Sequence, residues 1–496
     1  MMQFGLEEVR KIASTGDYKR IPIYRELYAD RFTPIEVMRT LRAASRHCYL
    51  LESAEKNDQW GRYSFLGYAP SLELTCTDGI LCIRKGQEEE EKTEERFHTT
   101  HPKEAIRKIL AEYKSPRIEG LPPFTGGLVG YFSYEYIQYA EPGLKKGMPE
   151  PSDFRDVDLM LFDKVLVFDH YRQKLLLIVG VSTENLEESY RQAESELDDM
   201  ERLLESGAKA AFRPLHLKEE LKTCFSQEHY CSMVERAKQY IREGDIFQVV
   251  LSNPMEAQAE GNLFDTYRVL RTTNPSPYMF YFSSDDIEVA GASPETLVKL
   301  QDGVLHTFPL AGTRPRGKTQ EADQALEQEL LRDEKELAEH NMLVDLGRND
   351  LGKISILGSV EVEKYCSVER FSHVMHLGST VRGTISKEHD AADAIDAILP
   401  AGTLSGSPKF RACEIIEELE GRRRGIYGGA IGYLDFTGNM DTCISIRLAY
   451  KKNGTVCVQS GAGIVADSVP EKEFAECRNK AMAVVKALKE AEGGRI

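Results

Sequence analysis

The sequence lacks the features of membrane and exported proteins. Its 496 residues contain no uninterrupted apolar run of about 18 residues, the length that a membrane-spanning helix needs. The first residues, MMQFGLEEVRK, include no apolar segment of the kind found in a secretory signal. We therefore expect a cytoplasmic protein that has no membrane partner.

Closely spaced cysteine pairs are also missing. The ten cysteines are scattered along the chain, and none belongs to a Cys-x-x-Cys pair. This scatter argues against a zinc site and against a disulfide framework, so reduced thiols are the expected state.

Positive charge is scarce. Lys and Arg number 63 against 80 Asp and Glu, which gives a formal net charge of −17. Because binding to phosphate backbones needs clustered Lys and Arg, nucleic acid is excluded as the main partner. The excess of acidic residues is explained by solubility alone.

The distribution of patterns along the chain predicts three segments. Residues 1–182 mix short alternating strands with a few helices, residues 183–225 form a polar helix and a linker, and residues 226–496 mix helix and strand again. Strands and helices do not alternate regularly, so we expect an α+β fold with antiparallel sheets rather than a doubly wound fold. The stretch Met440 to Tyr450 alternates apolar and polar residues and predicts one strand, with Arg447 on its polar face.

Two Glu-x-x-Glu motifs carry the strongest local signal. They are Glu336-Leu-Ala-Glu339 and Glu473-Phe-Ala-Glu476. On a helix this spacing places both carboxylates of a motif on one face, where a hard cation such as Mg2+ could bind them. A solvated helix face, with Glu476 paired to Lys480, is the commoner explanation of either motif alone.

Other segments could bind an anion. Gly461, Ala462 and Gly463 follow a predicted strand, and glycines at a strand exit can turn backbone N–H groups toward an anion. Arg447 could clamp a carboxylate beside them, and the loop AGTLSGSPK, which includes Thr403, opens a helix. A tight turn or a surface arginine explains each feature equally simply. Together with the acids, they suggest a site for a small dianionic acid held through a metal.

A resemblance to a known family rests on many motifs in a fixed order. From about residue 226 the sequence resembles the chorismate-utilising enzymes, in the stretches GDIFQVVLS, NPSPYMFYF, GASPE, PLAGTRPRG, AEHNMLVDLGRNDLG, HVMHLGSTVRG, LPAGTLSGSPK, GIYGGAIGY, IRLAY, SGAGIVADS and EFAECRNKA. The N-terminal LLESAEK resembles the tryptophan-sensor element of the anthranilate synthases. The resemblance implies antiparallel sheets packed face to face with helices outside, and intergrown regions.

Two positions sort the reactions of this family. Members that add water to chorismate carry a Lys where this chain has Gln248, and aminodeoxychorismate synthases carry a nucleophilic Lys where it has Ala311. The resemblance is therefore to the large subunits of anthranilate synthases, enzymes that form anthranilate, pyruvate and water from chorismate and ammonia. An aminodeoxychorismate synthase subunit and a non-catalytic regulatory subunit remain the alternatives.

The resemblance also implies a partner and a set of site residues. No Gly-x-Cys-x-Gly nucleophile occurs in the sequence, so a separate glutamine amidotransferase subunit would supply ammonia. Glu339 and Glu476 would hold Mg2+, with Glu336 and Glu473 nearby. Glu295 is the candidate acid for the leaving hydroxyl and His376 a candidate in the elimination, with Thr403 and Lys480 in support. The expected chorismate-binding residues are Gly312, Thr313, Tyr427, Arg447, Gly461, Ala462 and Gly463.

Feedback inhibition by tryptophan is the last implication. Two segments far apart in the sequence, LLES and NPSPYM, would together form an inhibitor pocket away from the active site. Glu52 would meet the ammonium group and Ser53 would hydrogen-bond to the ligand. Pro277, Tyr278 and Met279 would offer backbone groups and apolar surface for an indole. An ordinary strand end and an ordinary proline turn are the alternative explanation.

Overall fold

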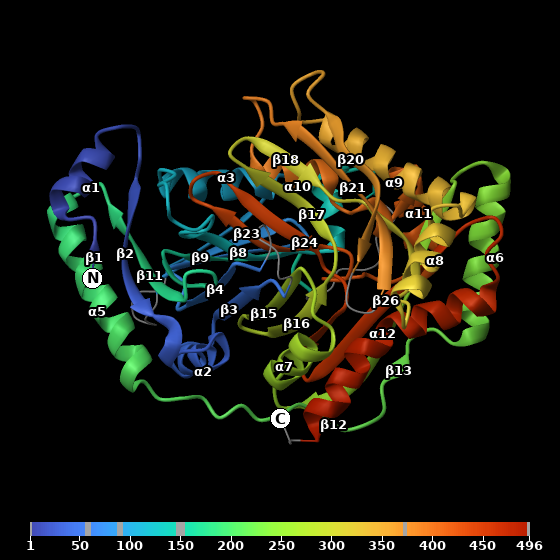
Figure 1. The fold of residues 1–496 in the computed structure, drawn as a ribbon, viewed down its shortest axis with the longest axis horizontal. Helices are drawn as coiled ribbons and strands as arrows, with labels where there is room; N and C mark the ends of the chain where they lie inside the picture. Colours follow the sequence, from blue (N-terminus) through green and yellow to red (C-terminus); the bar gives the residue numbers. More distant parts are fainter. Residues whose placement is uncertain (1, 55–60, 87–92, 145–153, 371–373, 494–496) are drawn as a thin grey trace.

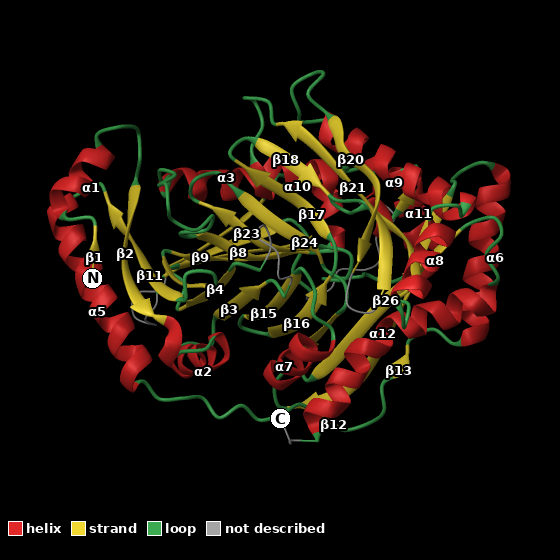
Figure 2. Ribbon diagram, viewed as in Figure 1, coloured by secondary structure: helices red, strands yellow, loops and turns green. Residues whose placement is uncertain are grey.

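A computed structural model describes residues 2–54, 61–86, 93–144, 154–370 and 374–493. Two large antiparallel sheets lie face to face, and helices cover their outer surfaces (Figures 1 and 2). The expected α+β fold is thereby confirmed. Among the described residues, every helix is too short or too polar to cross a membrane.

Among the described residues, the first sheet has 14 strands. Its central order is β1 (Met2–Gln3), β2 (Arg20–Tyr28), β11 (Lys174–Ser182), β10 (Lys164–Asp169), β4 (Tyr63–Tyr68), β3 (Cys48–Glu52), β15 (Tyr278–Ser283), β16 (Ile287–Ser293), β25 (Leu448–Lys452), β26 (Thr455–Ile464), β14 (Gln248–Glu260) and β12 (His216–Leu217). Two short strands, β13 (Lys222–Thr223) and β22 (Gly406–Ser407), also pair with β14.

Within the same described ranges, the second sheet has 12 strands. Its order is β19 (Leu310–Pro315), β21 (Val374–Thr384), β18 (Val304–Thr307), β17 (Thr296–Gln301), β24 (Met440–Ile444), β23 (Ala430–Asp435), β8 (Gly127–Phe132), β9 (Val157–Phe162), β5 (Leu72–Thr77), β6 (Ile80–Lys85) and β7 (Thr93–His98), with β20 (Glu361–Arg370) paired to β21. Strands from before residue 182 and from after residue 226 stand side by side in both sheets, so the two regions are intergrown.

Helices pack on the outer face of each sheet. On the first sheet lie α1 (Leu6–Ala13), α2 (Pro34–Ala44), α5 (Leu186–Ser206), α7 (Phe264–Thr273) and α12 (Pro470–Glu492), with α6 (Gln227–Glu243) and α11 (Lys409–Glu420) at its β14 end. On the second lie α3 (Pro102–Glu112), α8 (Gln320–Leu330), α9 (Glu334–Gly352) and α10 (Ala391–Ile398). The remaining short turns are α4 (Ile137–Ala140) and the 3-10 helices η1 (Ala29–Arg31), η2 (Tyr134–Tyr136) and η4 (Gly402–Leu404).

The central core is the aromatic layer between the sheets. Tyr49 of the first sheet packs edge-on against Phe162 of the second, with ring centroids 4.7 Å apart. Phe65 likewise meets Tyr433 at 6.0 Å. Burial of such large apolar side chains is the main force that holds two sheets together.

Several segments cross from one sheet to the other, and two of them, β16–β17 and β24–β25, lie side by side. The second of these corrects a sequence-based prediction. The chain leaves β16 of the first sheet and enters β17 of the second through Pro294 and Glu295. It returns from β24 to β25 through Ser445, Ile446 and Arg447, where Arg447 has a left-handed φ of 54°. The predicted single strand from Met440 to Tyr450 is therefore wrong, because the alternating pattern continues across a break that joins two different sheets.

Candidate functional site

The crossover segments β16–β17 and β24–β25 are hydrogen-bonded to each other. The Ile444 N–H donates to the carbonyl of Glu295 at 3.0 Å, and the Ala292 N–H donates to the carbonyl of Arg447 at 3.1 Å. The Ser293 hydroxyl adds a bond of 2.7 Å to the Ile444 carbonyl. These bonds fix the positions of Glu295 and Arg447 relative to each other, because each residue lies on one of the paired crossovers.

Glu295 has the environment of a carboxylic acid that keeps its proton near neutral pH. Burial raises its pKa to about 7, against the hydrogen bond from Thr403 and the positive charge of Lys480, which lower it. Thr403, on η4, donates to a carboxylate oxygen of Glu295 at 3.0 Å. A carboxyl group with such a pKa can serve as a general acid.

Arg447, Lys480 and the segment 461–463 form the next part of the site. Residues 461–463 lie within β26 and pair with β14, so the expectation that they follow the strand is wrong. Arg447 donates to the backbone carbonyl of Lys480 at 2.8 Å. The Lys480 ammonium lies 2.7 Å from Glu476 and donates to the carbonyl of Gly461 at 3.2 Å. A Cβ atom on Gly461 would lie 2.9 Å from the Tyr427 hydroxyl, so this position has no room for a side chain.

β19 and β21 bring His376 to the same region. The Nδ1 atom of His376 lies 2.8 Å from the carbonyl of Gly312 and 3.2 Å from the Thr313 hydroxyl. Since a carbonyl only accepts, Nδ1 carries the proton and Nε2 is an acceptor. Burial lowers the pKa of His376, and Arg447 lowers it further, so the ring is neutral near pH 7 and could take up a proton.

The two predicted glutamate pairs come from α9 and α12. Burial raises the pKa of Glu339, and the negative charges of Glu336 and Glu476 raise it further. Burial also raises the pKa of Glu473. Negative charges that raise the pKa of Glu339 in this way suit a hard cation, which would relieve the repulsion. The residues therefore fit Mg2+, although their oxygens lie farther apart than the ligand atoms of His47, Glu73 and Asp285.

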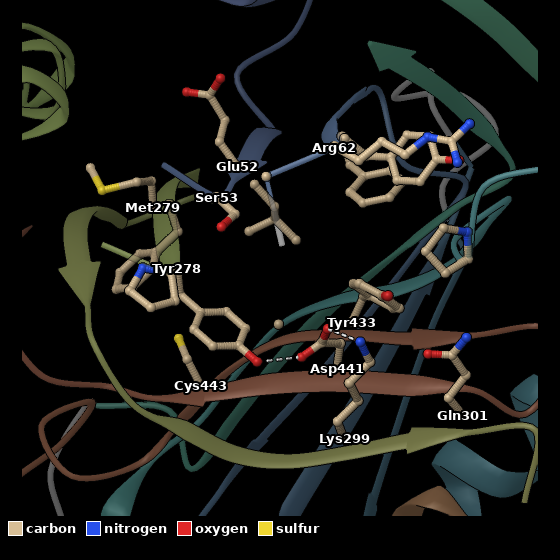
Figure 3. Close-up of a pocket in the computed structure, with 18 of the residues that line it drawn as sticks. Glu52, Ser53, Arg62, Tyr278, Met279, Lys299, Gln301, Tyr433, Asp441 and Cys443 are labelled. Atoms are coloured by element: carbon tan, nitrogen blue, oxygen red, sulfur yellow. Dashed lines mark hydrogen bonds and ion pairs between the residues drawn. The ribbon is translucent and has the colours of Figure 1, made fainter. Parts of the chain in front are cut away.

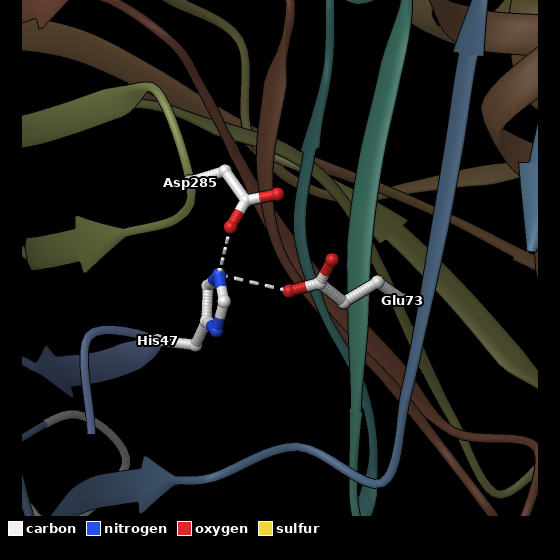
Figure 4. Close-up of side chains that lie close together, drawn as sticks. All are labelled: His47, Glu73 and Asp285. Carbon is white, nitrogen blue, oxygen red and sulfur yellow. Dashed lines mark hydrogen bonds and ion pairs between the residues drawn. The ribbon is translucent and has the colours of Figure 1, made fainter. Parts of the chain in front are cut away.

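Within the described ranges, the tightest metal-like trio lies elsewhere. Ligand atoms of His47, Glu73 and Asp285 lie within 4.8 Å of one another (Figure 4). The second oxygens of the two carboxylates, however, bind Arg84 at 2.9 and 2.6 Å. Because Arg84 and a protonated His47 already balance both charges, we interpret the trio as an ion-pair cluster that joins three chain segments.

All five residues expected to bind tryptophan line one cavity of about 410 Å³ between the sheets (Figure 3). Met279 on β15 pairs with Glu52 on β3, which brings the two segments together. The far wall carries Lys299, Asp441 and Cys443 of the second sheet. Among the described residues, the buried hydroxyl of Ser53 has no hydrogen-bond partner, as expected of a group that binds a ligand.

The role expected of Glu52 needs a correction. Its carboxylate accepts hydrogen bonds from the guanidinium of Arg271 at 2.8 and 3.1 Å, and from the hydroxyls of Tyr267 and Ser64. Figure 3 shows it turned away from Tyr278 and Asp441. An ammonium group would have to displace Arg271, so Glu52 supports the cavity wall rather than offering a free charge.

Sequence reasoning assigned no binding role to Gln248 or Asp441. Gln248 is buried, and its amide nitrogen lies 2.6 Å from the position that a Cβ on Gly463 would take. The resemblance had already marked position 248, but as a missing lysine only. Asp441, which accepts from the Tyr278 hydroxyl at 2.8 Å, had no signal, because its partner is 163 residues away.

Comparison with known proteins gives consistent matches. The sequence-family model of the chorismate binding enzymes matches residues 46–486. Anthranilate synthase component 1 of Acetivibrio thermocellus is 46% identical, over 98% of each chain. The crystal structure of anthranilate synthase component I from Streptococcus pneumoniae superposes with a TM-score of 0.72, at 39% identity over 87% of this chain and 93% of that one. The menaquinone-specific isochorismate synthase of Escherichia coli, at 20% identity over 97% of this chain and 98% of that one, has a TM-score of 0.68 and shares the fold alone.

Proposed function

The chain belongs to the anthranilate synthase component 1 family of chorismate binding enzymes, and on that premise we propose that it converts chorismate and ammonia to anthranilate, pyruvate and water. It is an enzyme of the anthranilate synthase type. The proposal extends to Mg2+ dependence, inhibition by tryptophan, a partner subunit and a cytoplasmic location.

The observation that carries the proposed reaction is the buried amide of Gln248 beside Gly463. In the described structure, the Gln248 amide oxygen has no hydrogen-bond partner although it is shielded from solvent. An amide oxygen can accept a hydrogen bond from ammonia but is far too weak a base to activate water. Gln248 therefore favours ammonia as the nucleophile.

The other residues suit the two steps of the reaction. Ammonia adds to the ring of chorismate, and the 4-hydroxyl leaves as water after it takes the proton of Glu295, whose pKa of about 7 keeps that proton available. Loss of a ring proton, to the neutral His376, then allows pyruvate to leave and the ring to become aromatic. Arg447 and the backbone at Gly461 to Gly463 would hold the enolpyruvyl carboxylate.

Glu339 and Glu476 would hold the cation, with Glu336 and Glu473 close by. A bound Mg2+ would neutralise and orient the ring carboxylate of chorismate. Lys480 lies between Glu476 and the carbonyl of Gly461, so it can hold the metal-binding helix α12 against the substrate-binding strand β26. This contact supports the placement of the cation beside the substrate.

Tryptophan inhibition and a partner subunit complete the proposal. The cavity between the sheets has aromatic walls, including Phe65 and Tyr433, and the unpartnered Ser53 hydroxyl. Both features suit an amino acid with an indole ring. A separate glutamine amidotransferase would supply ammonia, since the sequence has no Gly-x-Cys-x-Gly nucleophile.

One assay separates the alternatives. The chain is incubated with chorismate, Mg2+ and ammonium chloride, and anthranilate is followed by its fluorescence. Accumulation of aminodeoxychorismate would point to that synthase, and no turnover would point to a regulatory subunit.

In Gln248→Leu, which keeps the shape but not the amide, the KM for ammonia should rise about tenfold or more, as expected for the loss of one buried hydrogen bond. An unchanged KM would contradict the role of Gln248.

A further inference from the structure

Tyr278 links the cavity between the sheets to the crossover that carries Glu295. Its hydroxyl donates to a carboxylate oxygen of Asp441 at 2.8 Å (Figure 3). It also lies 2.9 Å from the hydroxyl of Thr296. Since the Tyr278 hydroxyl donates its hydrogen bond to Asp441, the Thr296 hydroxyl must donate to the Tyr278 oxygen. One phenol group therefore joins two strands of the second sheet.

Both partners of Tyr278 lie on the two strands that adjoin the proposed acid. Thr296 follows Glu295 in sequence and pairs with Cys443 on the neighbouring strand. Asp441 lies on β24, whose last residue, Ile444, donates its N–H to the carbonyl of Glu295 at 3.0 Å. A shift of the Tyr278 hydroxyl would therefore disturb both strands that hold the backbone of Glu295 in place.

The backbone of Tyr278 belongs to the opposite sheet. It lies at the start of β15, where Met279 pairs with Glu52 on β3, and the phenol bridges the gap to β17 and β24. Pro277, Tyr278 and Met279 all line the cavity, as does Asp441. A ligand that packs against the Tyr278 ring, or whose ammonium group attracts the Asp441 carboxylate, would compete with this bridge between the sheets.

We propose that Tyr278 is a positioning residue for Glu295, and that a ligand in the cavity acts on the reaction by displacing the Tyr278 hydroxyl from Thr296 and Asp441. The inference rests on the proposed inhibition by tryptophan and assigns its route. Inhibition requires that the ligand bind better when the bridge is broken, and linkage then requires that chorismate weaken tryptophan binding.

The test removes the bridge and keeps the cavity. Tyr278→Phe loses only the hydroxyl, and Thr296→Val loses the other hydroxyl while keeping its shape. In the parent, calorimetry should show tryptophan binding at least about fivefold weaker with saturating chorismate, the lower end of typical coupling. In both variants tryptophan should still bind, but chorismate should change its Kd less than about twofold. Tyr433→Phe, on the same cavity wall, should keep the parental ratio.

A second readout separates positioning from simple destabilisation. If the bridge sets the environment of Glu295, the pH dependence of kcat/KM without tryptophan should shift in the same direction in both variants, and the double variant should shift no further than either one. Parental coupling and a parental pH profile in Tyr278→Phe would overturn the inference while leaving tryptophan inhibition intact. Failure of the parent to bind tryptophan would overturn the proposed inhibition, and with it this route.

Discussion

Thr403 donates a hydrogen bond of 3.0 Å to the carboxylate of Glu295, and this contact opposes the effect of burial on the acid. The bond stabilises the ionised form, so it lowers a pKa that burial has raised to about 7. Since a general acid must be protonated, activity should decline as the pH rises above about 7.

The first prediction follows from this lowering of the Glu295 pKa by Thr403. Thr403→Val should move the alkaline decline of kcat/KM upward by about 0.5–1 pH unit, because the ionised form of Glu295 loses a hydrogen bond worth about 1 kcal/mol. The pH–rate profile measures this shift. Thr403→Ser keeps the hydroxyl and should keep the parental profile. A profile unchanged by valine would rule out Glu295 as the group that titrates.

The second prediction concerns the cation. Glu339→Gln and Glu476→Gln should each lower turnover at limiting Mg2+ by at least about tenfold, because each removes a charged oxygen ligand. Both should melt at the parental temperature. Glu334→Gln, an exposed position on the same α9 helix, is the matched control and should change little. Parental turnover in either variant would remove that residue from the metal site.

The third prediction concerns the cavity between the sheets. Ser53→Phe should fill it, leave activity largely intact and abolish inhibition by tryptophan, because the hydroxyl of Ser53 lies on the cavity wall. Ser53→Ala keeps the space and should bind tryptophan about tenfold more weakly at most, the effect of one lost hydrogen bond. Curves of activity against tryptophan concentration for both variants and the parent test whether tryptophan inhibits from this cavity. Full inhibition of the phenylalanine variant would place the inhibitor elsewhere.

The fourth prediction concerns stability. Burial alone would lower the pKa of His47, but hydrogen bonds to Asp285 and Glu73 outweigh it and raise this pKa to about 9, from 6.5 in the unfolded chain. The stabilisation is therefore complete below pH 6.5 and is lost as the pH rises through 9.

His47→Gln should accordingly reduce the free energy of unfolding by about 1–2 kcal/mol at pH 6, after allowance for solvent screening, and by little at pH 10. Denaturant titrations of variant and parent at the two pH values test this difference. A penalty of the same size at both pH values would show that packing, not charge, explains the role of His47.

Local sequence patterns predicted some of these features well and others poorly. The helices that carry the Glu-x-x-Glu motifs follow from spacing between near neighbours. The break at Arg447 does not, because apolar and polar residues continue to alternate in the sequence through the crossover. The sequence alone could place the residues on elements but not assign the elements to sheets.

The inhibitor cavity illustrates the same limit. The resemblance pointed to Ser53 and Tyr278, yet it could not show that Arg271 occupies the carboxylate of Glu52, since these residues are 219 positions apart. The bond from Tyr278 to Asp441 is equally long-range. Such contacts depend on the packing of two sheets and have no local signature.

The proposed reaction is tested most directly by its stoichiometry. The purified chain, supplied with chorismate, Mg2+ and an ammonium salt but no partner subunit, should form one pyruvate and one anthranilate for each chorismate consumed. Pyruvate is measured by coupled reduction and anthranilate by fluorescence in the same reaction. Equal amounts of both products would support the account, and consumption of chorismate without release of pyruvate would contradict it.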